Sequence, residues 1–124
     1  AVDTVTVLLA ASDGRHLCVH DSVGLEEEVE EGVCIPVGVG IAGRIAASGT
    51  PLLVEDLSTT EVASPILRNR GLRQLLGTPL RVEDQIVGVL HVGTAEAQRF
   101  GEEDRRRLQE LAESLRPFVQ SSAA

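Results

Sequence analysis

The sequence predicts an α+β domain built on a central antiparallel sheet of five or six strands. Three observations support this prediction: strand pairs joined by tight turns stand near both ends of the chain, short helical segments lie between them, and a longer amphipathic helix closes the chain. Hairpins produce antiparallel sheets, and helices with one apolar side pack on such a sheet. The 124 residues are enough for one domain with its own core.

Two hairpins frame the chain. Val, Leu and Thr dominate their strands, which we expect at residues 3–11 with 15–23 and at residues 75–82 with 85–93. Asp13-Gly14 is a typical two-residue hairpin turn, and Glu83-Asp84 forms a second tight turn. These turns fix which strands are neighbours in the sheet.

Shorter elements are expected between the hairpins. Residues 33–37 and 51–55 are apolar and predict two short strands, while residues 41–48 predict a short helix that Gly49 and Pro51 end. Ser64 can cap a further helical turn that has Pro65 at its first position and Gly71 as its stop. The acidic run EEEVEE at residues 26–31 is interpreted as a solvated loop.

The last element is a helix that begins near residue 102. Its first turn carries acidic side chains, which complement the positive end of the helix dipole. Helical spacing predicts a single apolar stripe, formed by Leu108, Leu111, Ala112, Leu115, Phe118 and Val119. Pro117 falls inside this helix, where it removes one hydrogen bond and clashes with the carbonyl of Glu113.

Composition excludes several classes of partner. A net charge of −8 disfavours nucleic acid and anionic lipid, because binding to either depends on basic clusters. No apolar run approaches the roughly 18 residues of a membrane span, so we expect a soluble protein. Two cysteines are too few for a disulfide framework and suit the reducing cytoplasm. Because the chain contains no methionine, we expect it to be part of a larger protein.

A glycine motif stands after the third expected strand. Gly38, Gly40 and Gly43 form G-x-G-x-x-G, the fingerprint of a dinucleotide-binding crossover. Pro36 is out of place in a central parallel strand, and the following helix of about two turns is too short for such a crossover. The motif is therefore interpreted as a tight turn that leads into a short helix.

Several segments together resemble a GAF domain across nearly the whole chain. They are GVGIAGRIAASGTPLLVEDL, SPILRNRGLRQLLGTPLRVEDQIVGVLHVGT and RFGEEDRRRLQELAE, in this order. The resemblance implies a GAF/PAS-like sheet with the short helices on one face and the long C-terminal helix on the other. It is strongest to GAF domains of bacterial, often actinobacterial, sensor histidine kinases and of serine/threonine phosphatases that control sigma factors.

The resemblance implies a regulatory module and not an enzyme. Residues 1–124 would form one cytoplasmic GAF domain whose N-terminal helix is missing. It would be homodimeric, bind an unknown small molecule or a partner, and relay its state to a kinase or phosphatase effector domain of the same chain. The alternative is a ligand-free scaffold whose role is dimerisation.

The resemblance also bears on cofactors and catalysis. GAF domains that bind cyclic nucleotides stack the base on an aromatic ring, and this chain has no Trp or Tyr and only Phe100 and Phe118. Bilin-binding members carry a Cys-His pair near residues 64–73, and haem-binding members a histidine there, and neither is present. GAF-fold methionine sulfoxide reductases place a reactive cysteine where Ala42 stands. We therefore expect neither these cofactors nor redox catalysis.

Four residues are candidates for the ligand pocket. His91 lies mid-strand among Val and Leu, and Arg44, Asp56 and Arg73 stand at element ends where a pocket rim is expected. The alternative is that His91 is a hydrogen-bonded core residue and that the other three form caps or salt bridges.

A second constellation suggests a metal or redox site. His16, Cys18 and His20 alternate along one strand, and antiparallel pairing can place Cys34 opposite Cys18. Two imidazoles and two thiols suit zinc, and the two thiols alone can form a switchable disulfide. The alternative is that Leu17, Val19 and Val23 face the core while the histidines face solvent or a partner.

Overall fold

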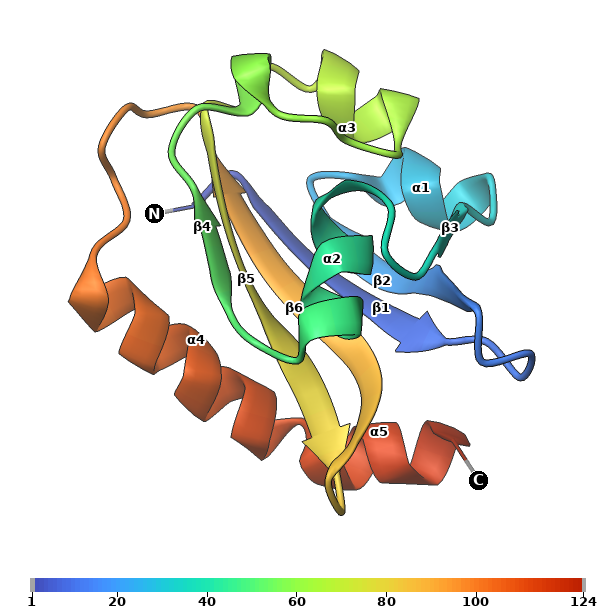
Figure 1. The fold of residues 1–124 in the computed structure, drawn as a ribbon. Helices are drawn as coiled ribbons and strands as arrows, with labels where there is room; N and C mark the ends of the chain where they lie inside the picture. Colours follow the sequence, from blue (N-terminus) through green and yellow to red (C-terminus); the bar gives the residue numbers. More distant parts are fainter. Residues whose placement is uncertain (1, 124) are drawn as a thin grey trace.

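The computed structural model describes the backbone of residues 2–123 and the side chains of residues 2–119. It contains a six-stranded antiparallel sheet in the order β3-β2-β1-β6-β5-β4, with helices on both faces (Figure 1). The strands are β1 (Thr4–Ala10), β2 (His16–Val23), β3 (Cys34–Pro36), β4 (Leu52–Val54), β5 (Gln74–Val82) and β6 (Gln85–Thr94). The helices are α1 (Glu26–Glu30), α2 (Gly40–Ser48), the 3-10 turn η1 (Leu57–Thr59), α3 (Pro65–Asn69), α4 (Glu102–Ser114) and α5 (Arg116–Ala123). The predicted fold class is confirmed.

Both predicted hairpins are present. β1 pairs with β2 and β5 pairs with β6, and the long central pair β1 and β6 joins the two hairpins into one sheet. Gly14 has φ +69°, and Glu83 and Asp84 have φ +50° and +69°, as turns with the twist of antiparallel strands require. β3 and β4, of three residues each, form the two edges.

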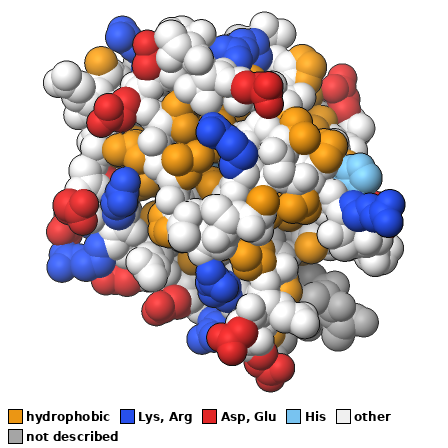
Figure 2. All heavy atoms as spheres, viewed as in Figure 1, with side chains coloured by type: hydrophobic (Ala, Val, Ile, Leu, Met, Phe, Trp, Pro, Cys, Tyr) orange, Lys and Arg blue, Asp and Glu red, His pale blue; other side chains and the backbone are white. Residues whose placement is uncertain are grey.

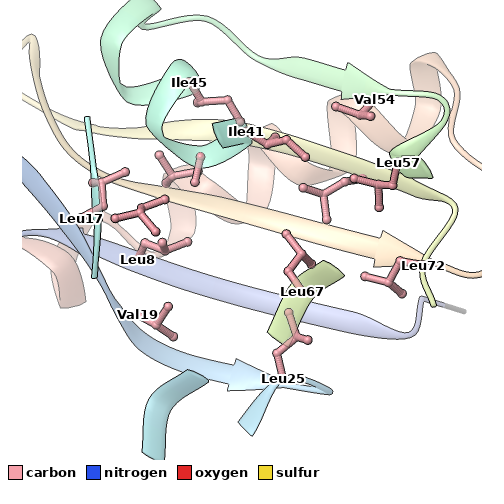
Figure 3. Close-up of a cluster of buried hydrophobic side chains, with 14 residues drawn as sticks. Leu8, Leu17, Val19, Leu25, Ile41, Ile45, Val54, Leu57, Leu67 and Leu72 are labelled. Carbon is pink, nitrogen blue, oxygen red and sulfur yellow. The ribbon is translucent and has the colours of Figure 1, made fainter. Parts of the chain in front are cut away.

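Side chains alternate between the two faces of the sheet, so each face has its own apolar cluster. One cluster lies between the sheet and the short helices and includes Leu8, Leu17, Ile41 and Ile45 (Figure 3). The other lies between the sheet and the C-terminal helices and includes Leu90. Each fully buried leucine or isoleucine contributes about 1.5–3 kcal/mol through removal from water.

Residues 26–30 correct the sequence prediction. They form α1 and not a loop, although five of the six residues in this acidic run are glutamates. The helix is held by tertiary contacts: Leu25 just before it is buried, and so is Glu28 within it. The other glutamates of the run are exposed, as predicted for the run as a whole.

The closing helix is divided at Leu115. α4 ends at Ser114 and α5 begins at Arg116, with Pro117 as its second residue. Proline lacks an N–H and clashes with the preceding turn, so the helix that we expected to continue through Pro117 is divided into two. The prediction of a single apolar stripe is wrong for Leu111 and Phe118, which are 42% and 71% exposed.

The glycine motif forms the turn between β3 and α2. A Cβ on Gly43 would lie 2.5 Å from the carbonyl oxygen of Pro36, and one on Gly40 would lie 2.8 Å from the backbone nitrogen of Ala63. The Gly38 N–H donates to the Gly43 carbonyl at 2.7 Å. These glycines therefore allow three backbone segments to approach closely. Among the described residues, none of the helices has both the length and the apolar character needed to cross a bilayer.

Candidate functional site

A small cavity of about 20 Å³ lies between the sheet and the short helices. Its wall is mostly aliphatic, and three side chains give it polar groups: Glu28, Ser64 and His91. The volume is close to that of one water molecule. A carboxyl, a hydroxyl and an imidazole thus meet in a space that an apolar core would otherwise fill.

Glu28 is brought to the cavity by α1. Its side chain is 3% exposed, and its carboxylate accepts a hydrogen bond from the Ser64 hydroxyl. Burial raises the pKa of the Glu28 carboxyl above its ordinary value of 4.5, and the hydrogen bond from Ser64 opposes part of that rise. A proton is therefore held on this carboxyl at higher pH than on an exposed glutamate.

Ser64 has two roles at once. Its oxygen accepts from the Leu67 N–H at 3.2 Å, which caps the N-terminus of α3 as the sequence predicts. Its hydroxyl donates a hydrogen bond to the carboxylate of Glu28, 36 residues earlier in the chain. The same side chain therefore fixes α3 and ties it to α1.

His91 lies in β6 on the sheet side of the cavity. It is 3% exposed, and its Nδ1 has no hydrogen-bond partner among the described residues. Burial lowers the pKa of His91 from 6.5 to about 4, so the imidazole is neutral at pH 7. Of the four predicted pocket residues, His91 alone lines this cavity.

The other three predicted pocket residues lie elsewhere. Arg44 and Asp56 border an open depression beside β4. Hydrogen bonds from the Ser58 side chain and backbone hold the pKa of the Asp56 carboxyl below its ordinary value, and the charge of Arg73 adds a smaller effect. Arg73 is exposed and borders neither space.

The four predicted metal or redox residues separate into a disulfide and two imidazoles. Cys18 and Cys34 are opposite each other in β2 and β3, as predicted, and form a disulfide. His16 Nδ1 lies 2.7 Å from Asp13 Oδ2, while His20 is exposed. Within the part of the chain described, no three His, Cys, Asp or Glu side chains are grouped to hold a metal ion.

A bulge accounts for the position of His20. Asp21 pairs with Val7 and Val19 pairs with Leu8, which leaves His20 without an opposite residue in β1. The bulge changes which residues of β2 face the helices: Leu17 and Val19 before it are buried, and so is Ser22 after it. Val23, which we expected in the core, is 66% exposed for this reason.

Larger hollows lie on the surface, and their polar side chains are mostly exposed. One of about 230 Å³ lies between β4, β5 and the C-terminal helices, and its arginines are bound to backbone carbonyls: Arg81 to Gly49 and Arg116 to Arg81. On the face that carries the short helices, arginines and acidic side chains are interspersed with apolar ones (Figure 2). The small cavity is the candidate site because its polar side chains, Glu28, Ser64 and His91, are all buried.

Comparison with known families agrees with this arrangement. A sequence model described as "GAF domain" matches residues 3–119. The chain belongs to the GAF domain family. GAF domains typically have regulatory or sensory roles, and the solved structures that share this fold include a methyl-accepting chemotaxis protein.

Two curated relatives share its sequence. The transcriptional activator RamA of Corynebacterium glutamicum is 30% identical over 102 residues, which are 79% of this GAF domain and 36% of RamA. Protein YtsP of Bacillus subtilis is 32% identical over 83 residues, which are 67% of this GAF domain and 50% of YtsP. The chain thus spans about a third to a half of the relatives it matches.

Solved structures share the fold at low identity. The GAF domain of a phosphoenolpyruvate-protein phosphotransferase from Coxiella burnetii has a TM-score of 0.85 at 19% identity, covering 98% of this chain and 74% of that one. A methyl-accepting chemotaxis protein has a TM-score of 0.81 at 18% identity, covering 98% and 79%. The free methionine-R-sulfoxide reductase of Neisseria meningitidis, in complex with its substrate, has a TM-score of 0.76 at 23% identity, covering 99% and 71%.

The reductase corrects one expectation. From the sequence we expected this GAF domain not to be an enzyme. The fold is shared with such reductases from Staphylococcus aureus, Neisseria meningitidis and Thermoplasma acidophilum, so this architecture supports catalysis and the exclusion was wrong. Position 42 is alanine and not cysteine, but the residue at this one position does not exclude catalysis.

Sequence reasoning missed the importance of Glu28. It lies within a run of like residues, and periodicity alone favours Val29 as the buried position of that run. The available signal was the spacing from Leu25 to Glu28, which places both on one side of a single helical turn. Ser64 was predicted as a cap, but its bond to Glu28 depends on a long-range contact.

Proposed function

We propose that this GAF domain is a sensory module that binds a small polar molecule in the cavity between the sheet and the short helices. The observation that supports this is that the buried side chains of Glu28, Ser64 and His91 line one small cavity. Burying polar groups is costly unless they are hydrogen-bonded, and His91 Nδ1 has no partner among the described residues. A ligand that donates or accepts a hydrogen bond there would remove that cost.

The polar lining favours a ligand with amine, amide or hydroxyl groups. The Glu28 carboxyl can accept from such a donor, and the neutral His91 imidazole can accept or donate depending on its tautomer. A cavity of about 20 Å³ holds no molecule of that kind, so α1 or α3 has to move outward for binding. Ligand binding would therefore change the position of a helix, which is what a sensor needs.

The receiver of the signal is proposed as another domain of a longer chain. Sensor histidine kinases and serine/threonine phosphatases remain the effectors that the sequence resemblance favours, and a homodimer is the proposed assembly. The similarity to the transcriptional activator RamA supports a DNA-binding effector as a further possibility. All three effectors would respond to a shift between two arrangements of the C-terminal helices, the only helices in the described residues on that face of the sheet.

A ligand-free dimerisation scaffold is the second candidate. The small volume of the cavity favours it, and so do Leu111 and Phe118, which leave apolar surface exposed on the C-terminal helices. The two candidates differ in what the purified protein carries. A retained small molecule supports the sensor, and a bare dimer supports the scaffold.

The test starts with native mass spectrometry of the purified domain against its denatured mass. Titration calorimetry with free methionine-R-sulfoxide follows, because a structural neighbour binds this molecule as its substrate, and loss of the sulfoxide in the presence of dithiothreitol is measured in parallel. We expect Glu28→Gln to weaken binding of any retained or added ligand by about tenfold, the loss of one charge-assisted hydrogen bond. Glu27→Gln, an exposed neighbour on α1, is the matched control. A bare mass without measurable binding would overturn the sensor proposal.

A further inference from the structure

The Cys18–Cys34 disulfide lies on the face of the sheet opposite the cavity. Leu17, Val19 and Ile35 point toward the short helices, so the residues that alternate with them point away. The Val19 N–H donates to the Val33 carbonyl at 2.9 Å, which marks a hydrogen-bonded pair; the adjacent cysteine pair is therefore a non-hydrogen-bonded one. Side chains approach most closely in such pairs, and the two cysteine Cα atoms are 4.0 Å apart.

The disulfide is accessible from solvent. Cys34 is exposed and Cys18 is partly exposed, and β3 forms the edge of the sheet. Both apolar clusters are built without the two cysteines, in a chain long enough to fold around such a core. The bond is therefore not part of either apolar cluster, and exposed disulfides are the ones that reductants reach most readily.

The segment that the disulfide closes forms one wall of the cavity. It runs from residue 18 to residue 34 and contains α1 with Leu25 and Glu28, both buried. Val33, at its end, and Ile35, directly after it, also line the cavity. The bond thus fixes both ends of the segment that carries the buried carboxylate, although its sulfur atoms never face the cavity.

We propose that Cys18 and Cys34 form a redox-controlled clamp on the cavity wall, opened by a dithiol reductant of the thioredoxin class. This inference rests on the proposed function, because it regulates access to the same cavity. A thiolate of the reductant attacks the exposed Cys34 sulfur, the S–S bond breaks, and the Cys18 sulfur leaves and takes a proton. The second thiol of the reductant then attacks the mixed disulfide and releases Cys34 as a thiol.

The exchange transfers two electrons and two protons from the reductant to the protein. The protein disulfide becomes two thiols, and the reductant dithiol becomes a disulfide. Once the crosslink is gone, residues 24–36 keep the Glu28 to Ser64 hydrogen bond, the bond from Arg70 Nε to the Gly24 carbonyl, the short β3 pairing and their apolar contacts. Local opening of this segment then becomes more frequent, and opening is what entry into so small a cavity requires.

Hydrogen exchange with mass spectrometry tests the clamp without any ligand. The oxidised domain is compared with the same domain reduced by thioredoxin, and the Cys18→Ser/Cys34→Ser double variant is carried through both treatments. We expect amides of residues 24–36 to exchange about tenfold faster or more after reduction, while β5 and β6 stay unchanged. The double variant should match the reduced protein and show no response to the reductant.

Three outcomes would overturn the clamp. They are a disulfide that thioredoxin leaves intact, equal exchange of residues 24–36 in both redox states, and a rise in exchange over the whole chain, which would make the bond a structural crosslink. Because the measurement uses no ligand, its result is independent of whether the cavity binds one. Calorimetry in both redox states then separates the two proposals: binding absent from both states contradicts the sensor and leaves the clamp standing.

Discussion

The hydroxyl of Ser64 donates a hydrogen bond to the carboxylate of Glu28, and this contact joins the start of α3 to α1 beside the cavity. Both side chains are buried, at 6% and 3% exposure. The two short helices are therefore coupled by a polar contact and not only by apolar packing. A ligand that competes for the Glu28 carboxyl would release both helices at once.

Ser64→Ala removes two interactions in one step. It deletes the cap of α3 and leaves the Glu28 carboxyl without its partner. We expect the free energy of unfolding to fall by about 1–3 kcal/mol. Urea denaturation at pH 7 measures the change, and Ser12→Ala, in the exposed turn between β1 and β2, serves as the control. Equal stability of both variants would show that the Glu28 contact contributes nothing.

Glu28 should make stability fall as pH rises. Its pKa is raised in the folded protein, so above about pH 4.5 the folded state binds more protons than the unfolded chain. The free energy of unfolding then decreases with increasing pH until the folded carboxyl has ionised. In Glu28→Gln this contribution is absent, so the variant should gain stability relative to wild type between pH 4.5 and pH 7. Urea denaturation across this range, with Glu27→Gln in parallel, decides the point; a constant difference between Glu28→Gln and wild type would contradict it.

His91 should act in the opposite direction. Its pKa is about 4 in the folded protein and 6.5 without burial, so the unfolded chain binds more protons between these values. Stability from this residue is complete above pH 6.5 and is lost as the pH falls toward 4, by up to about 3 kcal/mol at 1.36 kcal/mol per pKa unit. His91→Gln should remove this loss, whereas His20→Gln, at an exposed position, should keep it. NMR titration of the His91 ring protons gives an independent check, and an ordinary pKa there would refute the prediction.

Gly43→Ala tests what the glycine motif does. Alanine favours helix over glycine by about 1 kcal/mol, so propensity alone predicts a more stable protein. The contact of the new Cβ with the Pro36 carbonyl, at 2.5 Å, predicts the reverse, a loss of about 1–3 kcal/mol, because a backbone atom cannot move aside as a side chain can. Thermal unfolding distinguishes the two signs. Gly101→Ala, where a Cβ meets nothing within 4 Å, should cost about 1 kcal/mol or less, because only the N-cap preference of α4 for glycine over alanine is lost.

Local sequence rules predicted most of the fold and little of the site. The two hairpins follow from turn residues such as Gly14, and the register that opposes Cys18 to Cys34 follows from ordinary antiparallel pairing. α1 was missed because its burial comes from tertiary contacts that propensity does not contain. His91 was identified from its apolar surroundings, but its neighbours in the cavity come from elements far apart in the chain. Such convergence has no local signal.

The sequence identified Pro117 as the cause of a disturbance in the closing helix, but not the full break at Leu115. Pro117 was expected to disturb one helix, and it separates two. The predicted apolar stripe continued the period of α4 past the break and therefore placed Phe118 in the core. Phe118 lies after the break, and its side chain is exposed. Periodicity holds only as long as the helix itself continues.

The lengths of the strands have a further consequence for how this domain meets other chains. The longest strands are in the middle of the sheet, and the outermost ones, β3 and β4, have three residues each, with Pro36 ending one and Pro51 preceding the other. Short edge strands with proline offer few free backbone groups to an incoming strand, so the sheet is protected from growing by addition of a strand from another chain. Association would then have to proceed through side chains of the faces and helices, where it can be specific and reversible.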